Sequence, residues 1–277
     1  MSDSPSLANF SGSASLRARL EALPPDARVL DLGGWFCPLS RATHVADAMP
    51  YQTRLGRLNL APLPGERFTA DTWMLADFTA PAFRLPVPDK FFDFAFCGQT
   101  VEDLTTPEPL LREMRRVARA GVIESPTRLK EQSIGVRDRI TSLCGHPHHH
   151  WILDVVGQRL ELSPKSATAA LPRSRYALPL LACERLVNAG AAHDIHFAWT
   201  DTFEWRLLTN DEARARAEEF YRAAAPTFRE RITDPTIRRL RGLKWRMRGQ
   251  RADDPSAWLR EMLELSAPYR PGFPPPR

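Results

Sequence analysis

The chain has 277 residues, of which 43% are hydrophobic and 26% are charged, and its formal net charge is +5. This composition is ordinary for a globular protein and excludes a wholly disordered chain. The segment 229–251 holds nine Arg or Lys and two acids, a net +7, so the rest of the chain sums to −2. The basic balance therefore reports one local patch, and we expect no nucleic-acid partner.

Helices and strands alternate along the first half of the chain, with Gly33-Gly34 directly after the first strand. Such alternation, with short polar connections, predicts βαβ units and therefore a doubly wound α/β fold with a mostly parallel sheet. In chain order, the predicted elements are a helix at 16–23, strands at 28–32, 44–47 and 91–97, a helix at 107–119 and a strand at 121–124.

The second half continues with different patterns. The predicted elements are a hairpin at 151–162 around Gly157, an apolar helix at 176–188, two strands at 197–199 and 203–208, and helices from an N-cap at Asn210 onward.

The chain is expected to have three parts. Residues 1–14 are rich in Ser, Gly and Asn and predict a flexible leader, because they offer little to bury. A main domain follows at 15–208, with an insertion near 145–190, and a basic helical extension with a proline-rich tail fills 209–277.

The sequence also carries indications of its compartment. Its start lacks a basic segment followed by an apolar stretch, and no apolar run reaches the roughly 20 residues of a membrane span. Four cysteines lie far apart, without the paired spacing of a metal site or a disulfide framework. We therefore expect reduced thiols, a cytoplasmic location and no membrane span.

Five residues at the ends of predicted strands are candidates for a ligand site. In an open parallel sheet, the ligand crevice lies beyond the carboxyl ends of the strands. A pair of glycines lets the backbone approach a ligand, and a strand-end carboxylate can accept from a hydroxyl or ammonium group. It remains open whether each residue only forms a turn or a cap. The candidates are Asp31, Gly33, Gly34, Asp47 and Asp77.

Two cofactors are compatible with a glycine turn after the first strand. A dinucleotide fingerprint needs a third glycine, which the stretch 33–38 lacks. Asp31, just ahead of the turn, would repel a pyrophosphate but attract the cationic methionine part of S-adenosylmethionine. The charge therefore favours the sulfonium cofactor.

Four stretches, VLDLGGW, ATHVADAMPY, LPVPDKFFDFAFCGQTVEDL and LLREMRRVARAG, carry a family resemblance in their order and spacing. They resemble class I S-adenosylmethionine-dependent methyltransferases, and more narrowly the family with a methyltransferase type 11 domain. The resemblance covers about residues 28–126. It implies a Rossmann-like domain at 15–208, methyl transfer as the activity and S-adenosylmethionine as the cofactor.

The resemblance also implies a role for seven residues. The chain departs from the family where Trp35, Phe36 and Cys37 replace a more frequent Gly-x-Gly, and where a glutamine replaces a more frequent histidine. By the resemblance, the methionine part would be held by Asp31, Gly33 and Gly34, the ribose hydroxyls by Asp47, and the adenine by Asp77 and Phe78, with Gln99 bordering the sulfonium.

The stretch GHPHHHW places four histidines within 146–150. A hydroxyl acceptor must lose its proton as it attacks, and an imidazole that titrates near neutrality suits that task. His148 and His149 are our candidates for this base, and no metal is assigned. Two alternatives stay open, a metal site made of His148, His150 and Asp154, and a structural cluster that caps the following hairpin.

The acceptor side of the protein carries weaker indications. The order ESPTR and then HPHHHW resembles sugar and surface-glycan pathway enzymes, so we expect a small-molecule or glycan acceptor that is methylated on oxygen. Trp199, Phe203 and Trp205 could stack on a sugar, but we expect them in the core.

The basic segment is the second candidate for a functional surface. Its apolar residues, Ile237, Leu240, Leu243 and Met247, are expected to dock the helix and to leave its arginines free for an anionic partner. That partner could be a diphosphate-linked acceptor, an acidic polymer or an anionic membrane surface. A non-catalytic protein of the same fold, binding through this segment, is the alternative to an enzyme.

Overall fold

The computed structural model describes residues 14–35, 37–55, 65–137, 139, 143–168 and 175–247. The leader predicted at 1–14 therefore lies outside the described residues, apart from Ala14. The same holds for the proline-rich tail and for the basic residues beyond 247.

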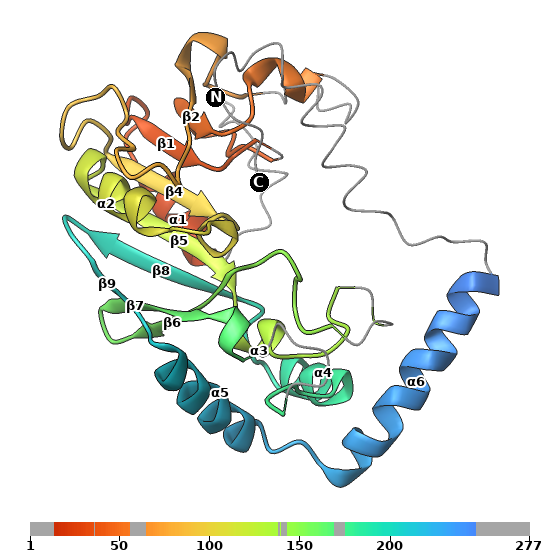
Figure 1. Cartoon of the computed structure of the whole chain (residues 1–277). Helices are drawn as coiled ribbons and strands as arrows, with labels where there is room; N and C mark the ends of the chain where they lie inside the picture. Colours follow the sequence, from red (N-terminus) through yellow and green to blue (C-terminus); the bar gives the residue numbers. More distant parts are fainter. Residues whose placement is uncertain are drawn as a thin grey trace.

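A six-stranded sheet forms the centre of the first half (Figure 1). Its first five strands run parallel and β8 runs antiparallel to β5. The strand order is β3-β2-β1-β4-β5-β8, so the direction of winding reverses between β1 and β4. The strands are β1 (Val29–Leu32), β2 (His44–Asp47), β3 (Trp73–Leu75), β4 (Phe94–Gly98), β5 (Ala120–Pro126) and β8 (Asp194–Thr200).

Helices cover both faces of this sheet. Successive side chains of a strand point to opposite sides, so the apolar residues of a buried strand need cover on both faces. Leu30 and Leu32 of β1 lie in the apolar cluster that contains Leu111 of α2 (Glu108–Val117). Val29 lies in the other cluster, with Leu16 of α1 (Ala14–Glu21). The predicted doubly wound α/β fold is confirmed.

A second, three-stranded sheet has the order β6-β7-β9, with β6 (Trp151–Val156), β7 (Arg159–Pro164) and β9 (Glu204–Leu207). The predicted hairpin around Gly157 is confirmed as β6 and β7. The two strands predicted around 197–208 both form, but in different sheets. Asp201, with a φ of 65°, lies in the turn between them.

The remaining helices follow the strands of the second half. The capping box of α5 has Thr209 as its N-cap, because the Thr209 N–H donates to Glu212 Oε2 at 2.9 Å. The N-cap predicted at Asn210 was therefore one residue late. The helices are α3 (Arg128–Glu131), α4 (Leu180–Asn188), α5 (Asn210–Ala224) and α6 (Phe228–Met247), and the short 3-10 turns are η1 (Tyr51–Leu55), η2 (Ala70–Thr72), η3 (Val101–Asp103) and η4 (Lys165–Ala167).

Helix α6 is oriented opposite to the sequence prediction. Its buried side is polar, with Asp234 2% and Arg238 9% exposed and joined at 2.8 Å. This side meets polar groups of α4, since Asp234 accepts from the Leu181 N–H and Arg241 pairs with Glu184. The expected apolar docking face was wrong, and so was the expectation that all its arginines are free. Three of the four residues predicted to dock are exposed, Leu240 (61%), Leu243 (52%) and Met247 (79%).

Two further expectations concern the whole chain. All four cysteines are free thiols, as predicted. Among the described residues, no helix combines the length and the apolar character that crossing a bilayer requires.

Candidate functional site

The carboxyl ends of β1 and β4 meet where the sheet reverses its winding, the place where open α/β sheets bind ligands. Gly33 follows β1 with a φ of +83°, and a Cβ at this position would lie 2.0 Å from Oγ1 of Thr100. A Cβ on Gly34 would lie 2.5 Å from Oδ2 of Asp31. Both glycines are therefore required by close packing, and they bring the backbone directly onto the switch point.

Two buried carboxylates lie beside this turn. Asp31 is 2% exposed and accepts from the Leu39 N–H at 2.7 Å. Asp47, at the end of β2, is 7% exposed and accepts from the N–H groups of Trp35 and Met49 at 3.0 and 2.7 Å. Burial raises the pKa of Asp31 to about 7, with a further contribution from the charge of Asp47 and against the effect of the Leu39 bond. A cation bound here would restore the charged form of Asp31.

The other predicted cofactor residues lie further along the same edge. Asp77 follows β3, and its Oδ1 accepts from both the N–H and the hydroxyl of Thr79. Phe78 is 5% exposed and packs in the core against Phe83. Gln99 follows β4 with a φ of 51°, and its side chain is exposed. The structure thus brings Asp31, Gly33, Gly34 and Asp47 together, with Asp77 and Phe78 beyond β3 and Gln99 beyond β4.

Three imidazoles form what we call the histidine cluster, His146, His148 and His149, in which one nitrogen of each ring lies within 4.8 Å of the others. His149 is 8% exposed, and its Nδ1 lies 3.1 Å from Glu131 Oε1. Asp103 Oδ1 lies 3.5 Å from Nε2 of His149 and 3.7 Å from Nε2 of His148. The cluster therefore contacts one carboxylate on its inner side and another on its outer side.

Buried charges hold the inner side of the histidine cluster. Lys165 pairs with Glu131, and both side chains are almost fully buried. The Lys165 ammonium also donates to the His146 carbonyl at 2.6 Å. Burial opposes the ionisation of Glu131, but its bonds to His149 and Lys165 outweigh this effect and lower its pKa. A charged carboxylate is thereby fixed against His149.

Two features set the protonation of the cluster and its surroundings. Burial is the main cause that lowers the pKa of both His146 and His148 to about 4, so these rings are neutral at neutral pH. Glu102 is fully buried, and burial raises its pKa well above its usual value. Neither carboxyl oxygen of Glu102 has a hydrogen-bond partner among the residues that the structure describes.

The histidine cluster lies on the same edge of the large sheet as the glycine turn. Asp103 belongs to η3, which follows β4, and Glu131 belongs to α3, which follows β5 (Figure 1). The His150 N–H donates to the Glu102 carbonyl at 2.7 Å, which ties the histidine stretch to η3. The glycine turn therefore lies beyond β1, and the groups that contact the histidine cluster lie beyond the next two strands of the sheet, β4 and β5.

The metal set considered from the sequence, His148, His150 and Asp154, was wrong. Asp154 is bound by the guanidinium of Arg128, with Nε 3.0 Å from Oδ1. It lies within β6, four residues beyond the exposed His150 and so roughly 13 Å along an extended chain. The third imidazole that lies close to those of His148 and His149 is that of His146, not that of His150.

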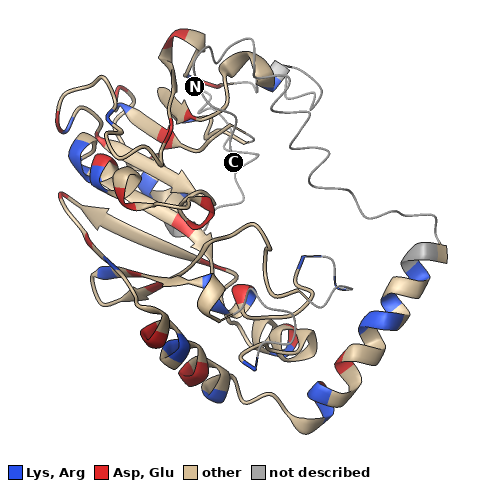
Figure 2. Ribbon diagram, viewed as in Figure 1, with Lys and Arg blue, Asp and Glu red and all other residues tan. Residues whose placement is uncertain are grey.

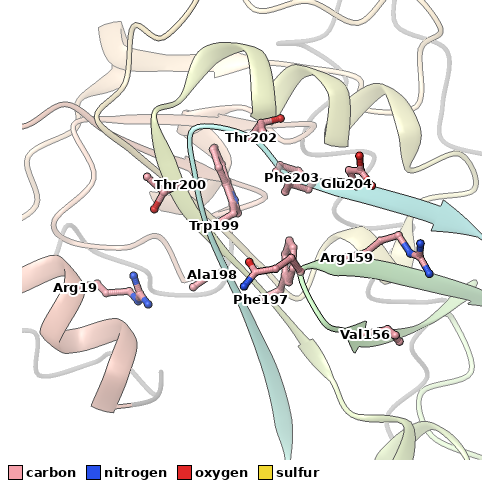
Figure 3. A pocket seen from close by; sticks show the side chains of 11 residues that line it. Arg19, Val156, Arg159, Phe197, Ala198, Trp199, Thr200, Thr202, Phe203 and Glu204 are labelled. Atoms are coloured by element: carbon pink, nitrogen blue, oxygen red, sulfur yellow. The ribbon is translucent and has the colours of Figure 1, made fainter.

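A cavity of about 720 Å³ lies at the opposite edge of the sheet, near the start of β5. Arg19 and Arg159 approach it from two sides (Figure 3). Trp199 and Phe203 border it but are only 5% and 3% exposed, and Trp205 packs against the same core. These aromatic residues are core residues, as expected from the sequence.

Comparison with known proteins agrees with this architecture. Residues 56–123 match a methyltransferase domain family. The sequence matches no protein of curated function.

Two solved structures illustrate the similarity. A SAM-dependent methyltransferase from Aquifex aeolicus is 18% identical, with 41% of this chain and 63% of that chain covered and a TM-score of 0.32. The YcgJ protein from Bacillus subtilis is 20% identical, with 41% and 50% covered and a TM-score of 0.29. The chain thus spans less than two thirds of either structure.

Fold and site define an α/β protein of the Rossmann-like class, with a ligand crevice at the switch point of its sheet. Within that class, residues 56–123 match a methyltransferase domain family, in agreement with the predicted resemblance to methyltransferases of the type 11 family. The match implies S-adenosylmethionine as the cofactor.

Proposed function

We propose that the chain transfers the methyl group of S-adenosylmethionine to a hydroxyl oxygen of a sugar or glycan precursor in the cytoplasm. The observation that carries methyl transfer is the glycine turn with two buried carboxylates at the switch point of a methyltransferase-like sheet. In the reaction, the S–CH3 bond breaks and an O–CH3 bond forms. The acceptor proton leaves to a base, and S-adenosylhomocysteine is released.

The cofactor is proposed to lie along the edge from β1 to β3. Asp31, with Gly33 and Gly34, would face the cationic methionine part, whose charge favours the ionised form of this buried carboxyl. Asp47 would accept from the ribose hydroxyls. Its oxygens accept the N–H groups of Trp35 and Met49, which fix the carboxylate at the end of β2 beside the glycine turn.

Three further residues complete the proposed cofactor site. Asp77 and Phe78 would border the adenine, and Gln99 would lie near the sulfonium. The place of each after β3 or β4, on the edge that holds the glycine turn, supports these roles.

The histidine cluster is proposed to activate the acceptor hydroxyl. Glu131 contacts Nδ1 of His149, which leaves Nε2 as the nitrogen that can accept a proton. The side chain of His148 is 58% exposed and therefore reachable by an entering acceptor. His148 and His149 are thus the two residues that we propose for this task, with His149 the stronger candidate, because burial lowers the pKa of His148 to about 4 and makes its imidazole a weaker base than expected. The resemblance of the surrounding sequence to glycan pathway enzymes supports a hydroxyl acceptor.

An anionic lipid surface is the partner that we propose for α6. Lys and Arg recur along this helix (Figure 2), and its exposed side also carries large apolar residues. Arg229, Arg239 and Lys244 are exposed and have no acidic partner among the described residues. An apolar stripe flanked by cations suits the interface of an anionic bilayer. The exposed apolar residues are Phe228, Ile232, Leu240, Leu243 and Met247.

Calorimetry with S-adenosylmethionine tests the central proposal. Asp47→Asn should weaken binding about ten-fold, because a charged hydrogen-bond acceptor contributes roughly 1.5–3 kcal/mol. The exposed Asp71 of η2 provides the matched control, and Asp71→Asn should bind like the wild type. Absence of binding to the intact protein at millimolar cofactor would overturn the proposal. A screen of sugar hydroxyl acceptors with the bound protein then tests the acceptor class.

A further inference from the structure

We propose that the histidine cluster, together with Asp103, is a binding site for one divalent transition-metal ion such as Zn²⁺. The role of such a metal in activating the acceptor rests on the proposed function. The binding of the metal does not.

Ligand spacing is the first argument. At metal–ligand distances of about 2.0–2.1 Å, the corners of a tetrahedral site lie roughly 3.3 Å apart. Asp103 Oδ1 is 3.5 Å from His149 Nε2 and 3.7 Å from His148 Nε2, close to this value. One nitrogen of His146 joins the other two imidazoles within 4.8 Å. Binding one ion would require the stacked rings of His146 and His149 to turn so that their nitrogens converge, with Asp103 joining from the side of His148 and His149.

The surroundings of His149 are the second argument. A ligating histidine commonly directs its other ring nitrogen to a carboxylate, which fixes the tautomer and the orientation of the ring. Glu131 takes this position, with Oε1 3.1 Å from Nδ1 of His149. Lys165 holds Glu131 from the opposite side, and neither side chain can turn away into solvent because both are buried. Nε2 of His149 is therefore the nitrogen presented to the centre of the cluster.

Ligand type and charge indicate the class of metal. Imidazoles favour zinc and neighbouring transition metals, whereas magnesium and calcium prefer oxygen ligands. The carboxylates of Asp103 and Glu131 contact the imidazoles directly, whereas the cations Lys130, Lys165 and Arg137 act on the cluster from around it. The two carboxylates in contact with the rings would attract an added cation.

The metal would also explain how a buried cluster can activate a hydroxyl. A hydroxyl bound to a divalent ion loses its proton far more readily than a free one. Asp103 is 41% exposed, so the outer side of the cluster is open to an acceptor. The histidines would then hold the metal instead of accepting the proton, the acceptor proton would pass to solvent water, and the acceptor oxygen would take the methyl group as the S–CH3 bond breaks.

Titration of the chelator-treated full chain with ZnCl2 and CoCl2 tests the inference. We expect one equivalent to bind, with visible Co²⁺ absorption bands typical of four-coordinate nitrogen and oxygen ligands. His148→Ala should reduce the affinity at least ten-fold without unfolding, because this side chain is 58% exposed. His150→Ala, one residue outside the cluster, should leave the affinity unchanged. Glu131→Gln should weaken binding about 10–100-fold through His149.

Two results would overturn the inference. One is stoichiometric binding that His148→Ala and His150→Ala affect equally, and the other is no binding at micromolar metal. Calorimetry with S-adenosylmethionine on the same samples distinguishes a failure of the metal site from a failure of the proposed function. A chain that binds the metal but not S-adenosylmethionine supports the metal site and removes the methyltransferase, and the reverse result removes only the metal site.

Discussion

The two halves of the molecule differ in the balance of apolar and ionic burial. In residues 14–126, two large apolar clusters cover the faces of the sheet, and the packed positions of α2, such as Leu111 and Met114, are completely buried. Residues 127–247 add Leu153 and Phe197 to one of these clusters, but their own apolar clusters are small, and more ionic groups are buried there. Examples are Arg128 with Asp154, Lys165 with Glu131, and Arg238 with Asp234.

Apolar burial and buried ion pairs contribute differently: the first stabilises the fold, and the second fixes the positions of side chains. Apolar burial is non-directional and contributes roughly 25 cal/mol per Å², so the two large apolar clusters supply most of the driving force for folding. Buried ion pairs add little net stability, because desolvation offsets the attraction, but each pair fixes one geometry. The second half therefore fixes polar groups such as His149 in place, and its stability depends on complete pairing.

The largest expected effect is the loss of one partner of a buried pair. The Arg128 side chain is 4% exposed and bonds Asp154, Ser163 and Gln132. Arg128→Met should lower the free energy of unfolding by about 3–5 kcal/mol, because Asp154 loses its counter-charge. Chemical unfolding followed by tryptophan fluorescence measures this change. Arg214→Met, which removes an exposed pair with Asp211, should cost less than about 1 kcal/mol. Equal losses in the two variants would contradict the comparison.

Helices α2 and α6 provide a second test. Met114→Ala should destabilise by about 2–5 kcal/mol, because it opens a cavity in the core. Leu240→Ala should leave the unfolding free energy nearly unchanged, since that side chain is 61% exposed. Leu240→Asp should keep the fold and reduce sedimentation with vesicles of anionic phospholipid, whereas neutral vesicles should bind neither protein. If Leu240→Ala unfolds the chain, the apolar side of α6 is covered by another part of it.

A third test is a pH dependence at the cofactor site. The folded-state pKa of Asp31, about 7, lies above its unfolded value of 3.8. Its contribution to stability is therefore complete below pH 4 and is lost as pH rises through 7. Cofactor binding should have the opposite trend, because the cation needs the ionised form. Affinity for S-adenosylmethionine should rise about ten-fold from pH 6 to pH 8.

Asp31→Asn is the matched variant for this effect, since it keeps the shape of the side chain. Both pH trends should flatten in calorimetry and in chemical unfolding of this variant. A wild-type affinity that stays constant between pH 6 and pH 8 would show that Asp31 does not titrate against the cofactor.

The sequence alone determined the elements whose signals are local. The apolar strand before Gly33-Gly34, the β4 strand and the α2 helix follow from patterns within a few residues, because backbone preference and side-chain period act over that range. The cofactor edge was predictable for the same reason. Carboxyl ends of parallel strands must meet at one edge, so Asp31 and Asp47 come together once the strands are known.

The tertiary structure decided the partners of the histidine cluster and the orientation of α6. Glu131 lies 18 residues before His149, and Lys165 lies 34 residues after Glu131, so no local period links them. Asp103 lies in η3, five residues after the end of β4, and this place beyond a strand end was a local indication of its role. For α6, the sequence revealed an apolar stripe but not which side docks. The polar surface of α4 decided that, because the buried charges of α6 had to be paired there and exposed apolar groups carry no such requirement.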